Sequence, residues 1–355
     1  MNRDSIRKLR LHLVEELKEY KGKPVKLDLP IDVLEEILFD HHKGKNDDNW
    51  KDFALELNND YLPCDILRKI DFTGVSFKDF RCIGLGPGYT GIVINPQEVY
   101  RKNLSRAKLD GIIFELDERG FNDVHFFETN FKGARLKDGS LVKINPQTID
   151  GKSLEKCILT DVVFDGSFDE ATILEADFSG SYNAIMDPQT IYGKSFEGTN
   201  LRNVTFINSF ESANIERASF EGSINAVINP QKIYNKSLFG TKLRDAYLIA
   251  ENMDDVKLKN TSFAGIKGNV FINPQTIYNK SMIGCNLAGI IFTGPLDKCR
   301  LMGTDFTGSI GGYFDAEQAF IDSHTILANV NISKLQKEND EVNKIKTLIK
   351  NTIHG

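Results

Sequence analysis

The 355-residue chain contains 41% apolar and 26% charged residues, a globular composition that excludes a wholly disordered or fibrous protein. It has no uncharged apolar run of about 18 residues, so the sequence predicts no membrane-spanning helix. The net charge of −6 gives no reason to expect direct binding to nucleic acid or to an anionic membrane. Five cysteines without a CxxC pair do not indicate a disulfide framework.

The first 20 residues, MNRDSIRKLRLHLVEELKEY, place charges among the apolar positions. A secretory signal would instead need a continuous apolar core, so this start predicts a cytoplasmic protein and leaves export without a signal open. We expect residues 1–61 to form a helical N-terminal cap region. Its predicted elements are a helix over 3–20 with an apolar stripe of Ile6, Leu9, Leu13 and Leu17, a helix over 31–39, a loop over 41–49 and a helix from Trp50 to Leu57.

One phrase recurs five times in the centre of the chain: NPQEVYRKN from Asn95, NPQTIDGKS from Asn145, DPQTIYGKS from Asp187, NPQKIYNKS from Asn229 and NPQTIYNKS from Asn273. The starts are 50, 42, 42 and 44 residues apart (145−95, 187−145, 229−187, 273−229), which indicates a repeat architecture. Asn or Asp before Pro is a favoured helix start. Each phrase is therefore predicted to contain one short helical turn that ends at the Gly or Asn before Lys.

A rhythm of five residues runs between these phrases, and it fits neither a helix nor an ordinary strand. After Lys194 the large apolar residues are Phe196, Leu201, Phe206, Phe210, Ile215 and Phe220. Small residues precede them by two positions, so both can face one interior in an extended segment. Glycine often follows by two positions and suits a turn. The rhythm predicts a square coil whose walls are parallel sheets.

This pattern resembles that of the pentapeptide-repeat proteins. The matching segments combine a small residue, Asp or Asn, and Leu or Phe: ADFSG (176–180), TNLRN (199–203), CNLAG (285–289) and TDFTG (304–308). The resemblance implies a right-handed quadrilateral β-helix with four pentapeptides per coil. The chain departs from the simplest members because an NPQ phrase interrupts the pentapeptides about once in every two coils.

We therefore predict a mainly β fold. Residues 62–325 are expected to form a right-handed parallel β-helix, a pentapeptide-repeat solenoid, between the cap region 1–61 and a C-terminal α-helix within 326–355. That helix is indicated by Leu335, Val342, Ile345, Ile349 and Ile353. Helical ends would cover the open strand edges of the stack. The alternative role for the last helix is a dimer contact or a docking arm, so the chain is expected to be a monomer or a homodimer through a terminal helix.

The sequence offers no convergent set of acid, base, nucleophile or metal ligand, so we predict no catalytic, cofactor-binding or metal site and no enzyme. Cys157, Cys285 and Cys299 stand at the small inward position of the repeat. Buried thiols at that position are expected to be inert. Cys64 and Cys82 lie where the repeat begins and have no assigned partner.

One recurring surface feature remains as a candidate partner-binding ladder. Its lysines are Lys102, Lys152, Lys194, Lys236 and Lys280, and its tyrosines are Tyr192, Tyr234 and Tyr278, together with Tyr100. Asp150 interrupts the tyrosines. In the structural interpretation each lysine holds the carbonyls of its own NPQ turn. In the functional interpretation the ladder binds a long anionic or protein partner.

Two functions follow from these patterns. The first is a non-enzymatic scaffold or adaptor that binds another protein with a rigid β-helix surface, a role that includes bacterial effectors of the resembled family. The alternative, also implied by the resemblance, is a DNA mimic that modulates DNA gyrase or topoisomerase IV. Acidic residues outnumber basic ones between 161 and 230, which favours the mimic. The basic cluster between 101 and 108 counts against the mimic.

Overall fold

The protein is described by a computed structural model that covers residues 3–29, 69–78, 92–315, 318–328 and 330–333. The predicted helices over 31–39 and 50–57, the loop 41–49, Cys64, Cys82 and the C-terminal helix lie outside the described residues. The chain divides into two compact units. The first contains residues 1–167 and 179–183, and the second contains residues 168–178 and 184–355.

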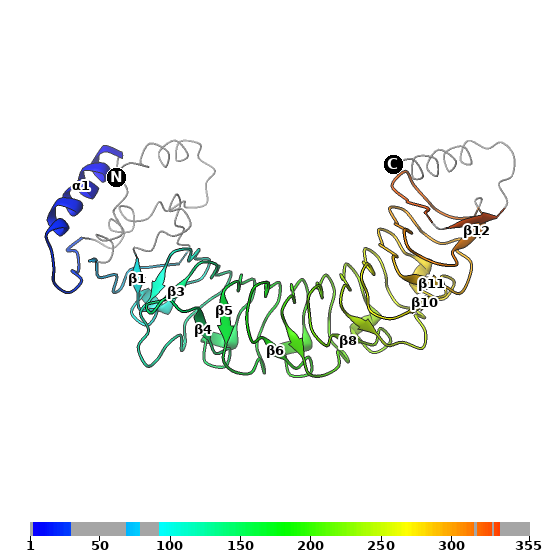
Figure 1. The fold of residues 1–355 in the computed structure, drawn as a ribbon, viewed down its shortest axis with the longest axis horizontal. Coiled ribbons are helices and arrows are strands. Elements are labelled where there is room, and N and C mark those ends of the chain that lie inside the picture. The colour runs from blue at the N-terminus through cyan, green and yellow to red at the C-terminus, as the bar shows by residue number, and fades with distance from the viewer. Residues whose placement is uncertain (1–2, 30–68, 79–91, 316–317, 329, 334–355) are drawn as a thin grey trace. The chain divides into compact units, whose positions relative to one another are not determined.

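The first unit begins with the helix α1 (Arg3–Lys18), as the apolar stripe predicted (Figure 1). Leu13 and Leu17 are buried, and Asp4 and Lys18 lie at the helix ends that favour their charges. The Lys69 ammonium group donates to the backbone carbonyl oxygen of Leu17 at 2.9 Å, and so binds the C-terminal end of the helix. No helix in the described part of the chain has both the length and the hydropathy needed to cross a bilayer.

Both units are built from coils of a parallel β-solenoid, as the repeat predicted. In the first unit a parallel sheet pairs strands in the order β1-β2-β3, and a second pairs β4 with β5. The strands are β1 (Val93–Ile94), β2 (Ile113–Phe114), β3 (Arg135–Leu136), β4 (Val142–Ile144) and β5 (Val162–Phe164). Within each sheet a strand lies 20–22 residues after its partner, at the same place on the next coil.

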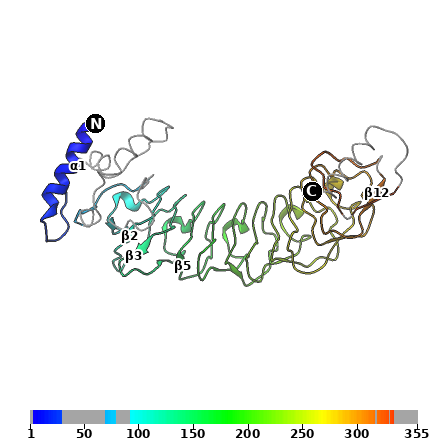
Figure 2. The same cartoon turned by 45° about the horizontal axis from the view of Figure 1, so that its top comes forward.

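In the second unit four parallel pairs follow one another, namely β6-β7, β8-β9, β10-β11 and β12-β13. Their bounds are β6 (Ile185–Met186), β7 (Thr205–Phe206), β8 (Val227–Ile228), β9 (Tyr247–Leu248), β10 (Val270–Ile272), β11 (Ile290–Phe292), β12 (Tyr313–Asp315) and β13 (Asn331–Ser333). Single parallel bridges, such as Thr205 with Ile224, join one pair to the next. The turned view in Figure 2 shows coils of this unit following one another in a row.

The five-residue pattern is found in the side chains as predicted. In the segment Thr199–Asn200–Leu201, Thr199 and Leu201 are fully buried, and Asn200 points outward between them. The small inward residue also links coils when it carries a donor. The Thr199 hydroxyl donates to the carbonyl of Ile173 at 3.0 Å, and the Cys285 thiol donates to the carbonyl of Leu258 at 2.7 Å. The interior thus satisfies backbone acceptors as well as excluding water.

Large inward side chains fill the centre of each coil. In the second unit Phe196, Phe206, Phe210 and Phe220 are buried and meet mostly edge to face, with ring centroids 4.8–6.1 Å apart. Such aromatic contacts stabilise by about 0.5–1.5 kcal/mol each beyond their buried area. Because these side chains occupy the bore, a ligand site inside these coils is excluded.

The NPQ phrase differs in part from its prediction. Its Asn or Asp side chain does accept the N–H two residues on, for example from Gln231 to Asn229 at 3.0 Å. The helical turn, however, is a 3₁₀ turn that starts only at the fifth residue after the Asn or Asp: Tyr100–Lys102, Asp150–Lys152, Tyr192–Lys194, Tyr234–Lys236 and Tyr278–Lys280.

The prediction that Gly or Asn ends this turn is wrong, because that residue is the middle residue of the turn. Gly193, Asn235 and Asn279 adopt φ between 51° and 59°, and the lysine that follows each has φ of 47°. Two successive residues in the left-handed region make a tight reversal for which Gly and Asn are the favoured residues.

Candidate partner-binding surface

Each NPQ phrase forms a corner where a glutamine side chain joins two successive coils. The Gln275 amide nitrogen donates to the carbonyls of Pro295 and Asp297 at 2.8 and 2.9 Å. Gln189 makes the equivalent pair of bonds to the carbonyls of Ser209 and Glu211 at 2.7 and 3.0 Å. One side chain therefore satisfies two backbone acceptors of the following coil.

The lysines of the predicted ladder belong to the same corners. The Lys194 ammonium group donates to Gln189 Oε1 at 2.8 Å, and Lys280 donates to Gln275 Oε1 at 2.7 Å. The acceptor is thus the glutamine side chain instead of the backbone carbonyls named in the structural interpretation. These two lysines hold the amide that holds the next coil, which gives them a structural role at the corner.

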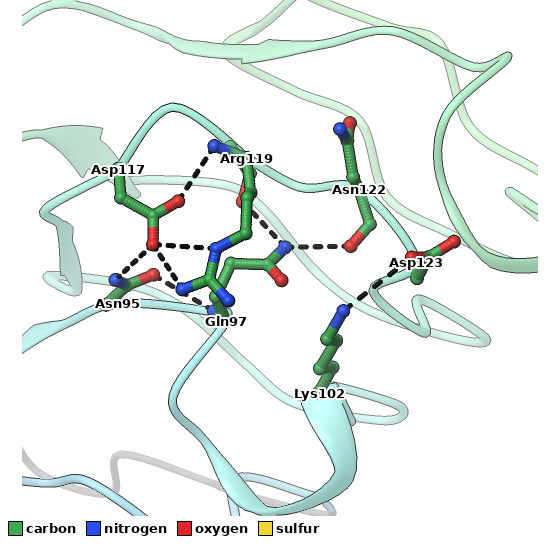
Figure 3. Close-up of polar contacts among 8 residues, drawn as sticks. Asn95, Gln97, Lys102, Asp117, Arg119, Asn122 and Asp123 are labelled. Carbon is green, nitrogen blue, oxygen red and sulfur yellow. Dashed lines mark hydrogen bonds and ion pairs between the residues drawn. The ribbon is translucent and has the colours of Figure 1, made fainter.

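The first corner departs from this arrangement, as Figure 3 shows. Gln97 donates to the carbonyls of Gly120 and Asn122 at 3.1 and 2.7 Å. The Lys102 ammonium group lies 3.6 Å from the Asp123 carboxylate instead of bonding the glutamine. Gln97 Oε1 is buried and accepts no hydrogen bond from the described residues.

A carboxylate also stands at this first corner. Asp117 accepts hydrogen bonds from the Arg119 guanidinium and, at 3.1 Å, from the Asn95 amide. The bond from Arg119 and then that from Asn95 hold the pKa of the Asp117 carboxyl well below its usual range. The group therefore stays ionised and paired at neutral pH. Across the described residues, no set of three or more His, Cys, Asp or Glu side chains is placed to hold a metal ion.

The tyrosines at these corners extend into solvent. In the second unit Tyr192, Tyr234 and Tyr278 are 62%, 54% and 46% exposed, and we call them the tyrosine row. Tyr100 of the first unit is 49% exposed. Asp150, which takes the tyrosine position in one repeat, pairs with the His125 imidazole at 2.7 Å. In the structure Lys194 and Lys280 are thus directed at glutamines and Lys102 at a carboxylate, while the tyrosines are directed outward.

A second exposed row was missed by sequence reasoning. Its members lie on the strand-bearing wall of the second unit and are all 45–63% exposed, and we call them the apolar row: Ile185, Ile207, Ile224, Tyr247, Ile249, Phe271, Ile310 and Tyr313. Each occupies an outward position between or beside inward residues, where the repeat pattern prescribes no residue type. The sequence signal that could have revealed this row was the recurrence of apolar residues at outward positions in successive coils.

The cysteines of the described part have the inward position that the repeat predicted. Cys157, Cys285 and Cys299 are at most 1% exposed. Burial raises the pKa of each of these thiols from 9.0 to about 12. A thiol that stays protonated at neutral pH is a poor nucleophile, so these three residues have the packing role expected for them.

Five acidic residues of the stretch between 161 and 230 form ion pairs with bases on neighbouring coils. Ion pairs of 2.6–3.9 Å join Asp161 to Arg135 and Asp165 to Lys143 in the first unit, and Glu197 to Arg217, Glu211 to Lys232 and Glu221 to Arg244 in the second. All are partly or largely exposed, so each contributes little to stability. Their effect is to offset negative charge locally.

A scan against protein-family models finds no match to the chain. A search of curated proteins finds no match either.

Proposed function

We propose that the chain is a pentapeptide-repeat protein that acts as a non-enzymatic scaffold or adaptor and binds another protein through the tyrosine row. The family assignment rests on the inward Thr199 and Leu201 pattern and on the coil length. Asn200, Ser219 and Lys242 pair in register at separations of 19 and 23 residues, which is close to four pentapeptides per coil. A right-handed quadrilateral β-helix accommodates both observations.

The observation that carries the proposed function is the recurrent exposure of one aromatic residue at the same corner in three successive repeats. Tyrosine is enriched at protein interfaces because it offers a large apolar ring with a polar end and loses little conformational entropy. Equivalent corners are two coils apart, so neighbouring tyrosines are separated by about 10 Å. The corner below each ring is fixed by the glutamine and its turn, which presents the rings in a constant geometry.

The DNA-mimic function is the second candidate, and the acidic stretch between 161 and 230 is the observation that favours it. A DNA mimic acts through an uncompensated negative surface that follows a phosphate backbone. The ion pairs with Arg135, Lys143, Arg217, Lys232 and Arg244 offset part of that charge. We therefore rank the scaffold first.

Affinity capture with the full chain tests the proposal. The wild type is compared with a triple variant, Tyr192→Ser, Tyr234→Ser and Tyr278→Ser, in lysate of the source organism. A matched control carries Asn200→Ala, Ser219→Ala and Lys242→Ala on the polar wall. We expect one protein to be retained by the wild type and the control and lost from the tyrosine variant.

Equal retention by all three proteins would overturn the assignment of the tyrosine row. Retention of gyrase or topoisomerase IV subunits that is lost at high salt and is insensitive to the tyrosines would favour the DNA mimic instead. In that case, replacing Glu170, Glu175 and Asp177 with the corresponding amides would be expected to abolish the capture.

A further inference from the structure

We propose that the apolar row is a self-association face, on which two copies of this chain pack the strand-bearing walls of their second units against each other. The row lies on a different wall from the polar ladder of Asn200, Ser219 and Lys242. It is also separate from the corners that carry the tyrosine row. The inference is therefore independent of the proposed function.

The strand register brings members of the row onto neighbouring coils. Ile185 pairs with Thr205, and Thr205 pairs with Ile224. Ile207 follows on the coil of Thr205, where its N–H donates to the carbonyl of Met186 at 3.1 Å. Successive coils of a parallel stack are about 4.8 Å apart, so Ile185 and Ile224 lie about 10 Å apart on either side of the coil that carries Thr205 and Ile207.

The same register continues through the later coils. Val227, three residues after Ile224, pairs with Tyr247. Phe271 pairs with Ile291, and Ile291 pairs with Ile310 on the coil after that. Ile249 extends the coil of Tyr247 and donates its N–H to the carbonyl of Ile228 at 2.9 Å. The pairings thus group the exposed side chains in three runs, which the chain joins between Ile224 and Val227 and between Lys267 and Phe271.

Charge is almost absent from this wall. The outward residues paired between the members of the row are Thr205, Val227, Lys267 and Ile291, of which one is charged. The Lys267 ammonium group lies 3.9 Å from an Asp245 carboxylate oxygen and 5.4 Å from the Tyr247 ring centroid. Its charge is therefore directed within the molecule. A surface with few charges can face a copy of itself with less of the like-charge repulsion that a strongly charged surface would meet.

The size of the row matches a dimer interface. Side chains of this kind that are about half exposed offer on the order of 100 Å² each, so the eight together offer on the order of 800 Å². The largest apolar patch of a typical soluble monomer is about 300–600 Å². A standard protein interface buries about 800 Å² on each partner. The row is thus larger than a monomer usually exposes and about as large as one side of a stable dimer.

The spacing of the row favours a second copy over an unrelated partner. Its ridges recur at about the 4.8 Å separation of the coils. A wall with the same separation can place its side chains between these ridges over the whole length, which a surface without this period cannot do. Stacked sheets pack about 10 Å apart with interdigitated side chains, and this is the geometry that two such walls would adopt.

A twofold axis near the middle of the row closes the assembly. Antiparallel alignment would place the Ile185 end of one copy against the Tyr313 end of the other, with Tyr247 and Ile249 close to the axis. An isologous contact of this type uses the same patch on both copies and gives a finite dimer, while a head-to-tail contact would grow filaments.

The test is the oligomeric state of the full chain. Sedimentation velocity from low micromolar to a few hundred micromolar is expected to show a concentration-dependent dimer. The double variant Ile207→Lys and Ile249→Lys places unpaired charges in the contact and should weaken dimerisation by at least about 100-fold. A control with the same added charge on another wall, Asn200→Lys and Ser219→Lys, should dimerise as the wild type does.

Thermal unfolding of both variants verifies that the coils are intact, and a milder pair, Ile207→Thr and Ile249→Thr, repeats the comparison without a charge. A wild type that stays monomeric at the highest concentration would overturn the proposal. A dimer that persists in the double lysine variant would overturn it equally, and would direct attention to a terminal segment.

Discussion

The corner glutamines show how one side chain fixes two coils. Gln275 uses both amide hydrogens on carbonyls of the following coil, and its oxygen accepts from Lys280. The sequence identified the lysine as recurrent but could not identify its acceptor. The hydrogen bond from Lys280 to Gln275 depends on the left-handed turn at Asn279, which brings the lysine ammonium group back over the glutamine.

A double-mutant cycle on this corner measures the energetic coupling between Gln275 and Lys280. We expect Gln275→Met to lower the free energy of unfolding by about 1–3 kcal/mol, because two backbone acceptors lose their donor. Lys280→Met should cost less, and the two changes together should cost less than their sum, because the lysine acts through the glutamine. Denaturant unfolding of the four proteins gives the coupling. Strict additivity would contradict the account, and Gln318→Met on an exposed side chain serves as the control.

The inward thiols make a second prediction at this scale. Burial raises the pKa of Cys157 and Cys285 from 9.0 to about 12, so both are protonated in the folded protein at pH 8. We expect neither to be alkylated under native conditions, and both to react after unfolding. Peptide mapping by mass spectrometry separates them from Cys64 and Cys82. Alkylation of the folded protein at the rate of the unfolded chain would contradict their packing role.

The sign of the pH dependence follows from the same shift. Below pH 9 the thiols are protonated in both states and their contribution to stability is intact. Between about pH 9 and 12 the unfolded chain loses the proton first, so stability falls as the pH rises. Cys285→Thr, which supplies the residue found at the equivalent positions Thr199 and Thr241, should reduce the fall while keeping the donor to the coil before.

At the scale of elements, the five-residue rhythm was sufficient to predict the coils, because inward burial imposes the same residue types at Thr199 and Leu201 as at their equivalents. The rhythm was not sufficient to predict the conformation of the NPQ corner. Proline after Asn95 resembles a helix start, yet the chain turns there and reaches its 3₁₀ turn only at Tyr100. Local capping rules describe the first hydrogen bond correctly, and the reversal that follows is set by packing onto the next coil.

The apolar row could not be predicted for a related reason. Outward positions are free of the inward pattern, and the separations between paired residues vary from 19 to 24 in the second unit. Ile185, Ile207 and Ile224 become neighbours only when the coils are placed in register. A sequence period alone does not supply that register.

Substitutions of Gly193 test the role of the left-handed turn in the corner. The φ of Gly193 is 59°, and a Cβ at this position would meet no atom within 4 Å. Gly193→Ala should therefore cost about 1 kcal/mol through backbone strain alone. Gly193→Asn should be nearly neutral, because Asn235 and Asn279 hold the same turn. Thermal or denaturant unfolding of both variants decides the point. Equal stability of the alanine and asparagine variants would contradict the assigned role of the turn.

At the scale of the whole molecule, the described surface is a set of regular outward rows over a filled interior. The tyrosine row and the apolar row lie on different faces of the second unit and can be occupied together. A dimer formed through the apolar row would therefore still present its tyrosines to a partner. Two copies would offer paired binding sites, which raises the effective affinity for a partner that is itself multivalent.

Site-specific photocrosslinking in cells of the source organism tests the scaffold function most directly. A benzophenone amino acid replaces Tyr234, and in a separate protein it replaces Ser219 on the polar wall as the control. We expect one discrete adduct of a different protein from position 234 and none from position 219. No adduct from position 234, or the same adducts from both positions, would contradict the assignment of the tyrosine row as the partner-binding surface.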